Sequence, residues 1–150
     1  MKKKRILASS DIKSKEFVSM AFSHQHEKSQ LITLSGSPDW VLVLWQWDKG
    51  KCVSHQNVAI KDPKFSATQC SFSILDSNSM LVTGNGVYKF FKLKDNGLKQ
   101  EPHQVTKKEK QISENFTCHT WLPDGRIIIC TDSGELILCE SNGEFKMVLN

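Results

Sequence analysis

The chain has 150 residues, of which 39% are hydrophobic and 24% are charged, and its formal net charge is +4. One globular unit with an ordinary core is expected, and the mild positive charge is dispersed, whereas a dedicated nucleic-acid-binding domain would concentrate it on one face. No apolar run approaches the length that a membrane-spanning helix needs.

The N-terminus is basic, but only three apolar residues follow Lys2–Arg5, so we expect no secretory signal. The five cysteines are odd in number and contain no Cys-x-x-Cys pair. They indicate a reduced intracellular protein of the cytoplasm or cytoskeleton.

Strand patterns then dominate the chain. Residues 4–10 are expected to form an outer strand that precedes the first repeat. Within residues 16–58, Val41–Trp45 is a β-branched and aromatic run typical of a strand covered on both faces. The short turns and the polar loop of this segment predict strands at 17–23, 31–35, 40–47 and 51–58.

The same order of apolar runs and turns follows twice more. Residues 67–98 form the second repeat, with a hairpin turn at Gly84-Asn85-Gly86, and residues 116–150 form the third, with a turn at Thr131–Gly134. Residues 99–115 between them are highly charged, which predicts an exposed, mobile polar insertion.

An aromatic residue marks the first strand of each repeat, at Phe22, Phe72 and Trp121, with spacings of 50 and 49 residues. This period is typical of β-propeller blades. We therefore predict an all-β fragment of about three four-stranded antiparallel blades. Because a propeller typically closes with about four to eight blades, the ring is not expected to close, and self-association or pairing with further blades is expected to cover the open ends.

Residues 35–39, Ser-Gly-Ser-Pro-Asp, followed by Trp45 and the turn Gly50-Lys51-Cys52, resemble the WD40 repeat. The resemblance implies structural roles for Asp39 and Trp45, and for Phe91 and Cys139 at the positions that match Trp45. The Trp-Asp dipeptide itself is intact in none of the three repeats, since these positions read Trp45-Gln46, Phe91-Lys92 and Cys139-Glu140.

Residues 4–23 and 42–47 are also similar to the cilia- and flagella-associated branch of WD-repeat proteins. So are the turns at 82–86 and 131–136. That resemblance implies a place in the motile axoneme, with axonemal or dynein-associated proteins as partners and a link to inner dynein arms.

Residues that could carry chemistry are few. His24 and His26 lie in a polar loop without a third metal ligand nearby. Cys118 and His119 are adjacent on a strand, so one side chain should point into the core and the other to the surface, and they cannot pair as nucleophile and base. No catalytic residue, cofactor or metal site is predicted.

Propellers bind partners through the loops at their rims, and aromatic side chains often anchor such contacts. We therefore expect Pro38, Trp40, Asn85 and Ser133 to line one partner-binding rim. The predicted function is a non-catalytic interaction scaffold of the ciliary axoneme, involved in the assembly or docking of inner dynein arms. The alternatives are a basic propeller that binds nucleic acid, which salt would weaken steeply, and a general intracellular WD40 adaptor.

Overall fold

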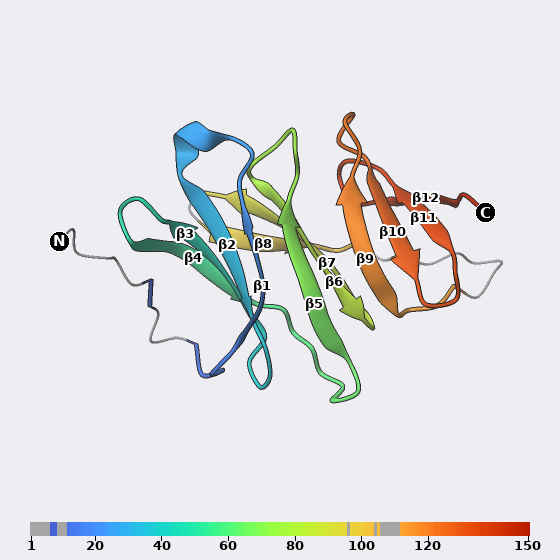
Figure 1. Cartoon of the computed structure of the whole chain (residues 1–150), viewed down its shortest axis with the longest axis horizontal. Coiled ribbons are helices and arrows are strands. Elements are labelled where there is room, and N and C mark those ends of the chain that lie inside the picture. Colours follow the sequence, from blue (N-terminus) through green and yellow to red (C-terminus); the bar gives the residue numbers. More distant parts are fainter. Residues whose placement is uncertain (1–6, 9–11, 96, 104, 106–111) are drawn as a thin grey trace.

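The computed structural model describes residues 7–8, 12–95, 97–103, 105 and 112–150. In this part of the chain, twelve strands form three four-stranded antiparallel sheets, each built in sequence order (Figure 1). We call the sheets blades 1, 2 and 3. The predicted all-β arrangement of three antiparallel blades without a closed ring is confirmed.

Each blade is a simple meander of four strands. Blade 1 contains β1 (Phe17–Phe22), β2 (Gln30–Ser35), β3 (Val41–Gln46) and β4 (Lys51–Asn57). Blade 2 contains β5 (Ser66–Phe72), β6 (Ser79–Asn85), β7 (Val87–Lys94) and β8 (Gly97–Glu101). Blade 3 contains β9 (Phe116–Trp121), β10 (Ile127–Thr131), β11 (Leu136–Cys139) and β12 (Phe145–Val148). A short 3-10 turn, His26–Lys28, interrupts the loop between β1 and β2.

Two segments differ from the sequence-based prediction or fall outside the described residues. Strand β8 continues to Glu101, into the stretch predicted to be a polar insertion, because Gln100 and Glu101 pair with Phe91 and Phe90 of β7. The predicted mobile part at 104 and 106–111 lies outside the described residues. So does the predicted outer strand at 4–10, apart from Leu7 and Ala8, which form no strand.

The strand register repeats from blade to blade. In each blade, the aromatic residue of the first strand pairs with an apolar residue of the second strand, which pairs with the WD-type position of the third. The three rows are Phe22–Leu31–Trp45, Phe72–Met80–Phe91 and Trp121–Ile127–Cys139. Since residues directly opposite in an antiparallel sheet point to the same face, each row lies on one face of its blade.

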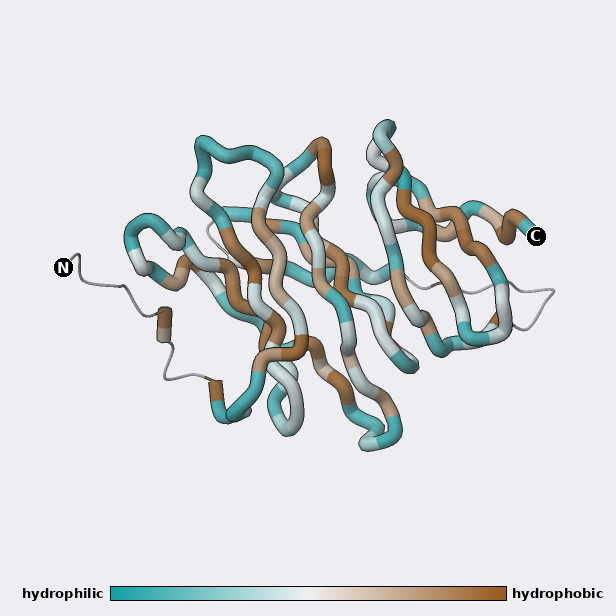
Figure 2. The backbone as a smooth tube through the Cα atoms, viewed as in Figure 1, coloured by the Kyte–Doolittle hydropathy of each residue, from teal (hydrophilic) through white to brown (hydrophobic). Residues whose placement is uncertain are grey.

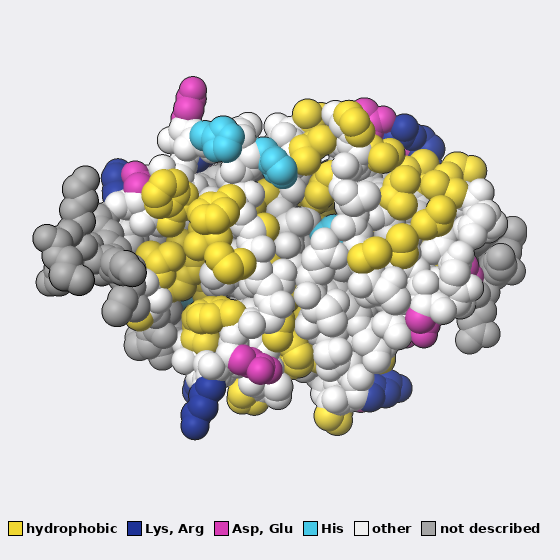
Figure 3. All heavy atoms as spheres, viewed as in Figure 1, with side chains coloured by type: hydrophobic (Ala, Val, Ile, Leu, Met, Phe, Trp, Pro, Cys, Tyr) yellow, Lys and Arg dark blue, Asp and Glu magenta, His cyan; other side chains and the backbone are white. Residues whose placement is uncertain are grey.

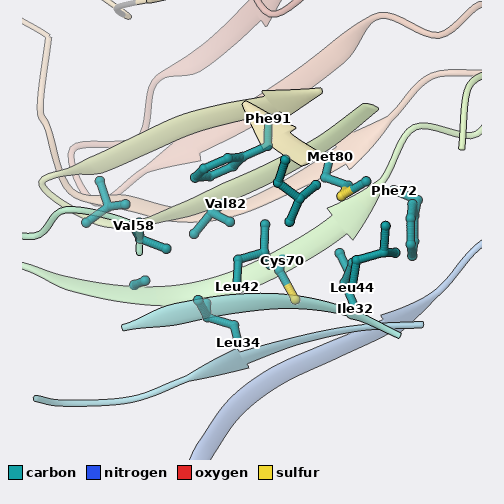
Figure 4. Close-up of a cluster of buried hydrophobic side chains, with 13 residues drawn as sticks. Ile32, Leu34, Leu42, Leu44, Val58, Cys70, Phe72, Met80, Val82 and Phe91 are labelled. Carbon is teal, nitrogen blue, oxygen red and sulfur yellow. The ribbon is translucent and has the colours of Figure 1, made fainter. Parts of the chain in front are cut away.

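The blades stack face to face, so that the middle strands are apolar on both sides (Figure 2). A first core lies between blades 1 and 2, where Leu42 and Leu44 meet Phe72, Met80 and others (Figure 4). A second core lies between blades 2 and 3 and includes Leu81, Phe90, Ile127, Ile129 and Ile137. Successive residues of β6 thus serve different cores, with Met80 facing blade 1 and Leu81 facing blade 3.

Side-chain hydrogen bonds also join the innermost strands of adjacent blades. The Ser19 hydroxyl of β1 accepts a hydrogen bond from the Cys70 backbone N–H of β5 at 3.1 Å. The Gln69 amide of β5 accepts from the His119 N–H at 2.9 Å and donates to the His119 carbonyl at 3.0 Å. Ser19 and Gln69 occupy equivalent positions, three residues before Phe22 and Phe72. Each contact between adjacent blades, which we call a joint, therefore has a polar contact beside its apolar core.

Candidate interaction surfaces

The turns between the second and third strands of all three blades lie at the same rim (Figure 1). Pro38, Asn85 and Ser133 lie on these turns and are exposed, whereas Trp40 is half-buried and packs against the first core. The structure thus places the four residues predicted as a partner-binding rim at the same end of the molecule, with Trp40 partly below the surface. We call these four residues the rim surface.

Residues of the chain between blades hold the rim turns in place. The segment Ser113–Asn115 bridges blades 2 and 3: the Gly86 N–H donates to the Glu114 carbonyl at 2.8 Å, and the Asp132 N–H donates to the Asn115 carbonyl at 3.1 Å. Hydrogen bonds from Ser113 and Asn115 to the Asp132 carboxylate hold the pKa of that side chain below its usual value. The turns of blades 2 and 3 are therefore connected into one surface.

Asp39 fixes the corresponding turn of blade 1. Its carboxylate accepts hydrogen bonds from the Lys13 N–H at 2.6 Å and the Ser14 N–H at 3.1 Å. The Ser35 hydroxyl lies 3.4 Å from the same carboxylate and accepts from the Val41 N–H at 2.8 Å. Asp39 therefore joins the turn to the segment that enters the blade, which is how a short carboxylate at a turn stabilises it.

The other three WD-type positions lie in the interior. Trp45 is buried, and its indole N–H donates to the Thr33 hydroxyl at 2.9 Å. Phe91 and Cys139 are fully buried and have no tryptophan N–H to donate. Burial in the two cores thus replaces at these positions the hydrogen bond that Trp45 makes.

The outer face of blade 1 is only partly covered by the described residues. Leu7, Ile12 and Cys52 pack over its centre, where four apolar side chains are buried: Leu31, Val41, Val43 and Trp45. Among these residues, no blade covers its first strand on this face. Phe22 is 58% exposed, whereas Phe72, at the same position of blade 2, is 1% exposed because blade 1 covers it. Phe22 makes an edge contact with Trp47, at 6.2 Å between ring centroids, and the two rings border a shallow apolar hollow with Leu7 and Leu31. Figure 3 shows hydrophobic side chains gathered over this blade.

Among the described residues, no blade covers the outer face of blade 3 either, and Figure 3 shows a second group of hydrophobic side chains on that side. Leu136 and Met147 are 38% and 46% exposed there. These individual residues were not predicted, because a sequence pattern does not show which blade has a neighbour. The strand register assigns Met147 to this face, because Met147 pairs with Leu138, which pairs with Ile128.

The sites considered for chemistry are not assembled in the described residues. Among these residues, no group of three or more His, Cys, Asp or Glu side chains could hold a metal ion. His119 is buried and Cys118 is exposed, so they point to opposite sides of β9, as predicted from strand geometry. No helix in the described part of the chain is long and apolar enough to cross a membrane.

His119 is a polar residue whose role was not predicted from the sequence. Its ring nitrogens lie 2.6 Å from the Ser71 hydroxyl and 2.7 Å from the Thr83 hydroxyl, and the Trp121 indole N–H donates to Ser71 at 2.8 Å. Burial lowers the pKa of His119 from 6.5 to about 4. The imidazole is therefore neutral at pH 7 and connects blades 2 and 3 as a hydrogen-bonding group.

Comparison with known proteins gives one consistent group by sequence. No protein-family model matches the chain. The chain is 34% identical over 151 residues to cilia- and flagella-associated protein 57 A of Tetrahymena thermophila, a match that covers 97% of this chain and 12% of that protein. It is 32% identical over 143 residues to cilia- and flagella-associated protein 57 of Mus musculus, covering 95% of this chain and 11% of that protein. The chain thus spans only about an eighth of the length of these relatives.

Solved structures give the fold. The β-propeller domain of Myceliophteria thermophila Cps50 (Swd1) matches with a TM-score of 0.67 and 10% identity, over 88% of this chain and 41% of that one. Chaetomium thermophilum Raptor matches with a TM-score of 0.61 and 11% identity, over 89% of this chain and 12% of that one. The predicted WD40-like β-propeller fold and the predicted resemblance to cilia- and flagella-associated proteins are confirmed.

Proposed function

From its similarity over nearly its whole length to cilia- and flagella-associated protein 57, we propose that this chain is a non-catalytic scaffold of the motile ciliary axoneme. Its blades would hold other proteins in place during the assembly or docking of inner dynein arms. Two observations support the proposal: the names of the relatives and the β-propeller fold. The finer role at the dynein arms comes from the resemblance alone.

We propose that the rim surface makes the contact with the axonemal partner. The observation that carries this assignment is that each turn is held in place by hydrogen bonds. Those of Ser113–Asn115 connect the turns of blades 2 and 3. The Asp39 carboxylate ties the turn of blade 1 to the backbone of Lys13 and Ser14. A surface that is rigid before binding loses little conformational entropy when the partner docks. Pro38, Asn85 and Ser133 present exposed side chains on this scaffold.

Cosedimentation with salt-extracted axonemes of Tetrahymena thermophila tests the assignment. The unaltered chain should sediment with axonemes that retain the binding site, and a variant with Asn85→Arg and Ser133→Arg should bind about tenfold more weakly. Two exposed positions replaced by long charged side chains block a close contact, and a tenfold change corresponds to about 1.4 kcal/mol.

A matched control carries His24→Arg and Glu27→Arg on the opposite rim, in the loop between β1 and β2, where both residues are exposed. This control should bind as the unaltered chain does. Equal binding by the rim variant and the unaltered chain would remove the rim assignment. Binding to axonemes that does not change when inner dynein arms are extracted would leave the scaffold role and remove the dynein role.

A further inference from the structure

Cys118 of β9 and Cys130 of β10 lie directly opposite each other in blade 3. Opposite residues of an antiparallel pair have Cα atoms about 4.5–5.5 Å apart. This separation falls within the range of about 4.4–6.8 Å that disulfides span. Since opposite side chains point to the same face of a sheet, the two thiols share the open face of blade 3.

The other three cysteines lack this arrangement. Cys70 and Cys139 are buried, and burial raises the pKa of each thiol to about 11. Cys52 lies in blade 1, opposite Trp45. In the single chain Cys118 is exposed and Cys130 is half-buried, so an oxidant in solution can reach this pair first whenever no second copy covers the face of blade 3.

We propose that Cys118 and Cys130 are a redox-active pair that closes reversibly to a cross-strand disulfide, with a small disulfide such as oxidised glutathione as the oxidant. The Cys118 thiolate attacks oxidised glutathione, which forms a mixed disulfide and releases one glutathione thiolate. The Cys130 thiol then loses its proton and attacks the Cys118 sulfur, which releases the second glutathione. The two protein thiols lose two electrons and two protons, and oxidised glutathione becomes two reduced molecules.

The order of the two steps follows from the surroundings of the thiols. Burial and the neighbouring Cys118 side chain raise the pKa of Cys130, which makes this thiol less readily ionised than an ordinary cysteine. The exposed Cys118 therefore reacts with the oxidant, and Cys130 resolves the mixed disulfide because it is held opposite. The inference does not depend on a ciliary role.

The position of the pair gives the disulfide a structural consequence. Cys118 lies three residues before Trp121 and is the counterpart of Ser19 and Gln69, whose side chains bind the backbone of the following blade. The counterparts of Cys130 are Leu34 and Thr83, the partners of Ser19 and Gln69 in the register. Oxidation would therefore alter the face of blade 3 at the place where the other two blades contact their neighbours.

The test is to incubate the reduced chain with oxidised glutathione, alkylate the remaining thiols in denaturant and measure the intact mass. Three of the five cysteines should be alkylated after oxidation, and all five after treatment with a reducing thiol. Cleavage after Arg126 and Glu135 separates Cys118, Cys130 and Cys139 onto different peptides, so the bridge can be located.

Single substitutions define the pair. Cys118→Ser should abolish the bridge, Cys130→Ser should stop at a glutathione adduct on Cys118, and Cys52→Ser should form the bridge as the unaltered chain does. Coincident thermal unfolding curves of the reduced proteins would show that the substitutions leave the fold intact. The proposal fails if all five thiols survive oxidation, if the bridge involves another cysteine, or if it joins two chains.

Discussion

At the scale of single residues, His119 shows how a polar side chain can be accommodated in the joint between blades 2 and 3. A buried imidazole requires partners for both ring nitrogens. Ser71 and Thr83 supply them, and Gln69 satisfies the His119 backbone. Burial disfavours the charged ring, which makes the contact between these two blades sensitive to acid.

The stability of the chain should fall as the pH falls from 6.5 towards 4, because the unfolded chain then takes up a proton on His119 that the folded chain does not. The stabilisation is fully present above pH 6.5, the ordinary value, and is lost as the pH falls through the folded value of about 4. Urea unfolding at pH 7.5 and 4.5 should show that this residue alone accounts for a loss of about 2–3 kcal/mol.

A His119→Gln variant provides the comparison, since it removes the titration while carboxylates still contribute to the pH dependence in both proteins. A His26→Gln variant, altered at an exposed loop position, controls for the loss of a histidine. If the His119→Gln variant lost as much stability between the two pH values as the unaltered chain, burial of the imidazole would not be the cause.

The sequence predicted part of this residue-scale picture. Strand alternation placed Cys118 and His119 on opposite sides of β9 but left open which side faced the core. The answer depends on Gln69, Ser71 and Thr83, which are about 36 to 50 residues away in sequence and come close only when the blades stack. Asp39 was predictable because turn aspartates hydrogen-bond nearby backbone N–H groups.

At the scale of elements, the contact between β5 and β6 is unusually close at Gly84. A Cβ atom added there would lie 2.7 Å from the Ala67 Cα and 2.9 Å from the Thr68 nitrogen, and closer still to the Ser66 carbonyl oxygen. All three atoms belong to the backbone of β5, which cannot move aside as a flexible side chain can. The Gly84-Asn85-Gly86 turn was predicted as a hairpin, but this close approach was not, because it comes from the bulge between Ala67 and Gln69.

Replacement of Gly84 by alanine should therefore lower the free energy of unfolding by about 1–3 kcal/mol, the usual cost of overpacking. Gly97→Ala is the matched control, since the nearest atoms to its added Cβ are 3.8 Å away, and it should change stability by less than about 0.5 kcal/mol. Denaturant unfolding of both variants measures the difference. Equal stability of the two variants would show that β5 moves without cost.

The positions of the strands followed closely from local signals, while their ends did not. Turn residues and apolar runs gave β1 to β4 within a few residues and placed the turn between β10 and β11, because these signals act over short distances. The end of β8 was missed because Gln100 and Glu101 are polar, and their pairing with β7 depends on an adjacent strand rather than on their own character.

At the scale of the whole molecule, three blades leave two faces without a neighbouring blade among the described residues, although Leu7 and Ile12 cover part of the face of blade 1. The face of blade 1 presents Met20 and Phe22, which are 59% and 58% exposed. In blade 2 the equivalent residues, Cys70 and Phe72, are covered by the face of blade 1 that carries Leu42 and Leu44. The corresponding face of blade 3 is exposed. Blade 3 of a second copy could therefore cover Met20 and Phe22 of blade 1.

The 150-residue chain should therefore associate head to tail, with blade 3 of one copy against blade 1 of the next. Two copies would bring together six blades, within the range of about four to eight in which propellers close. Light scattering at micromolar concentration should give a mass of twice the 17.0 kDa of one chain. Burial of each large apolar side chain in the contact contributes about 1.5–3 kcal/mol.

Met20→Lys with Phe22→Lys should shift this equilibrium to the monomer, because two charges would have to be buried in an apolar contact. Glu27→Lys, which adds a similar charge on the exposed loop between β1 and β2, should leave the dimer intact. A monomer that unfolds cooperatively at the same concentrations would show that the open faces need no neighbour. The register gives Phe22 and Phe72 the same position in their blades, so their exposed fractions differ because only Phe72 has a neighbouring blade over it. The mass in solution measures whether a second copy supplies that blade for Phe22.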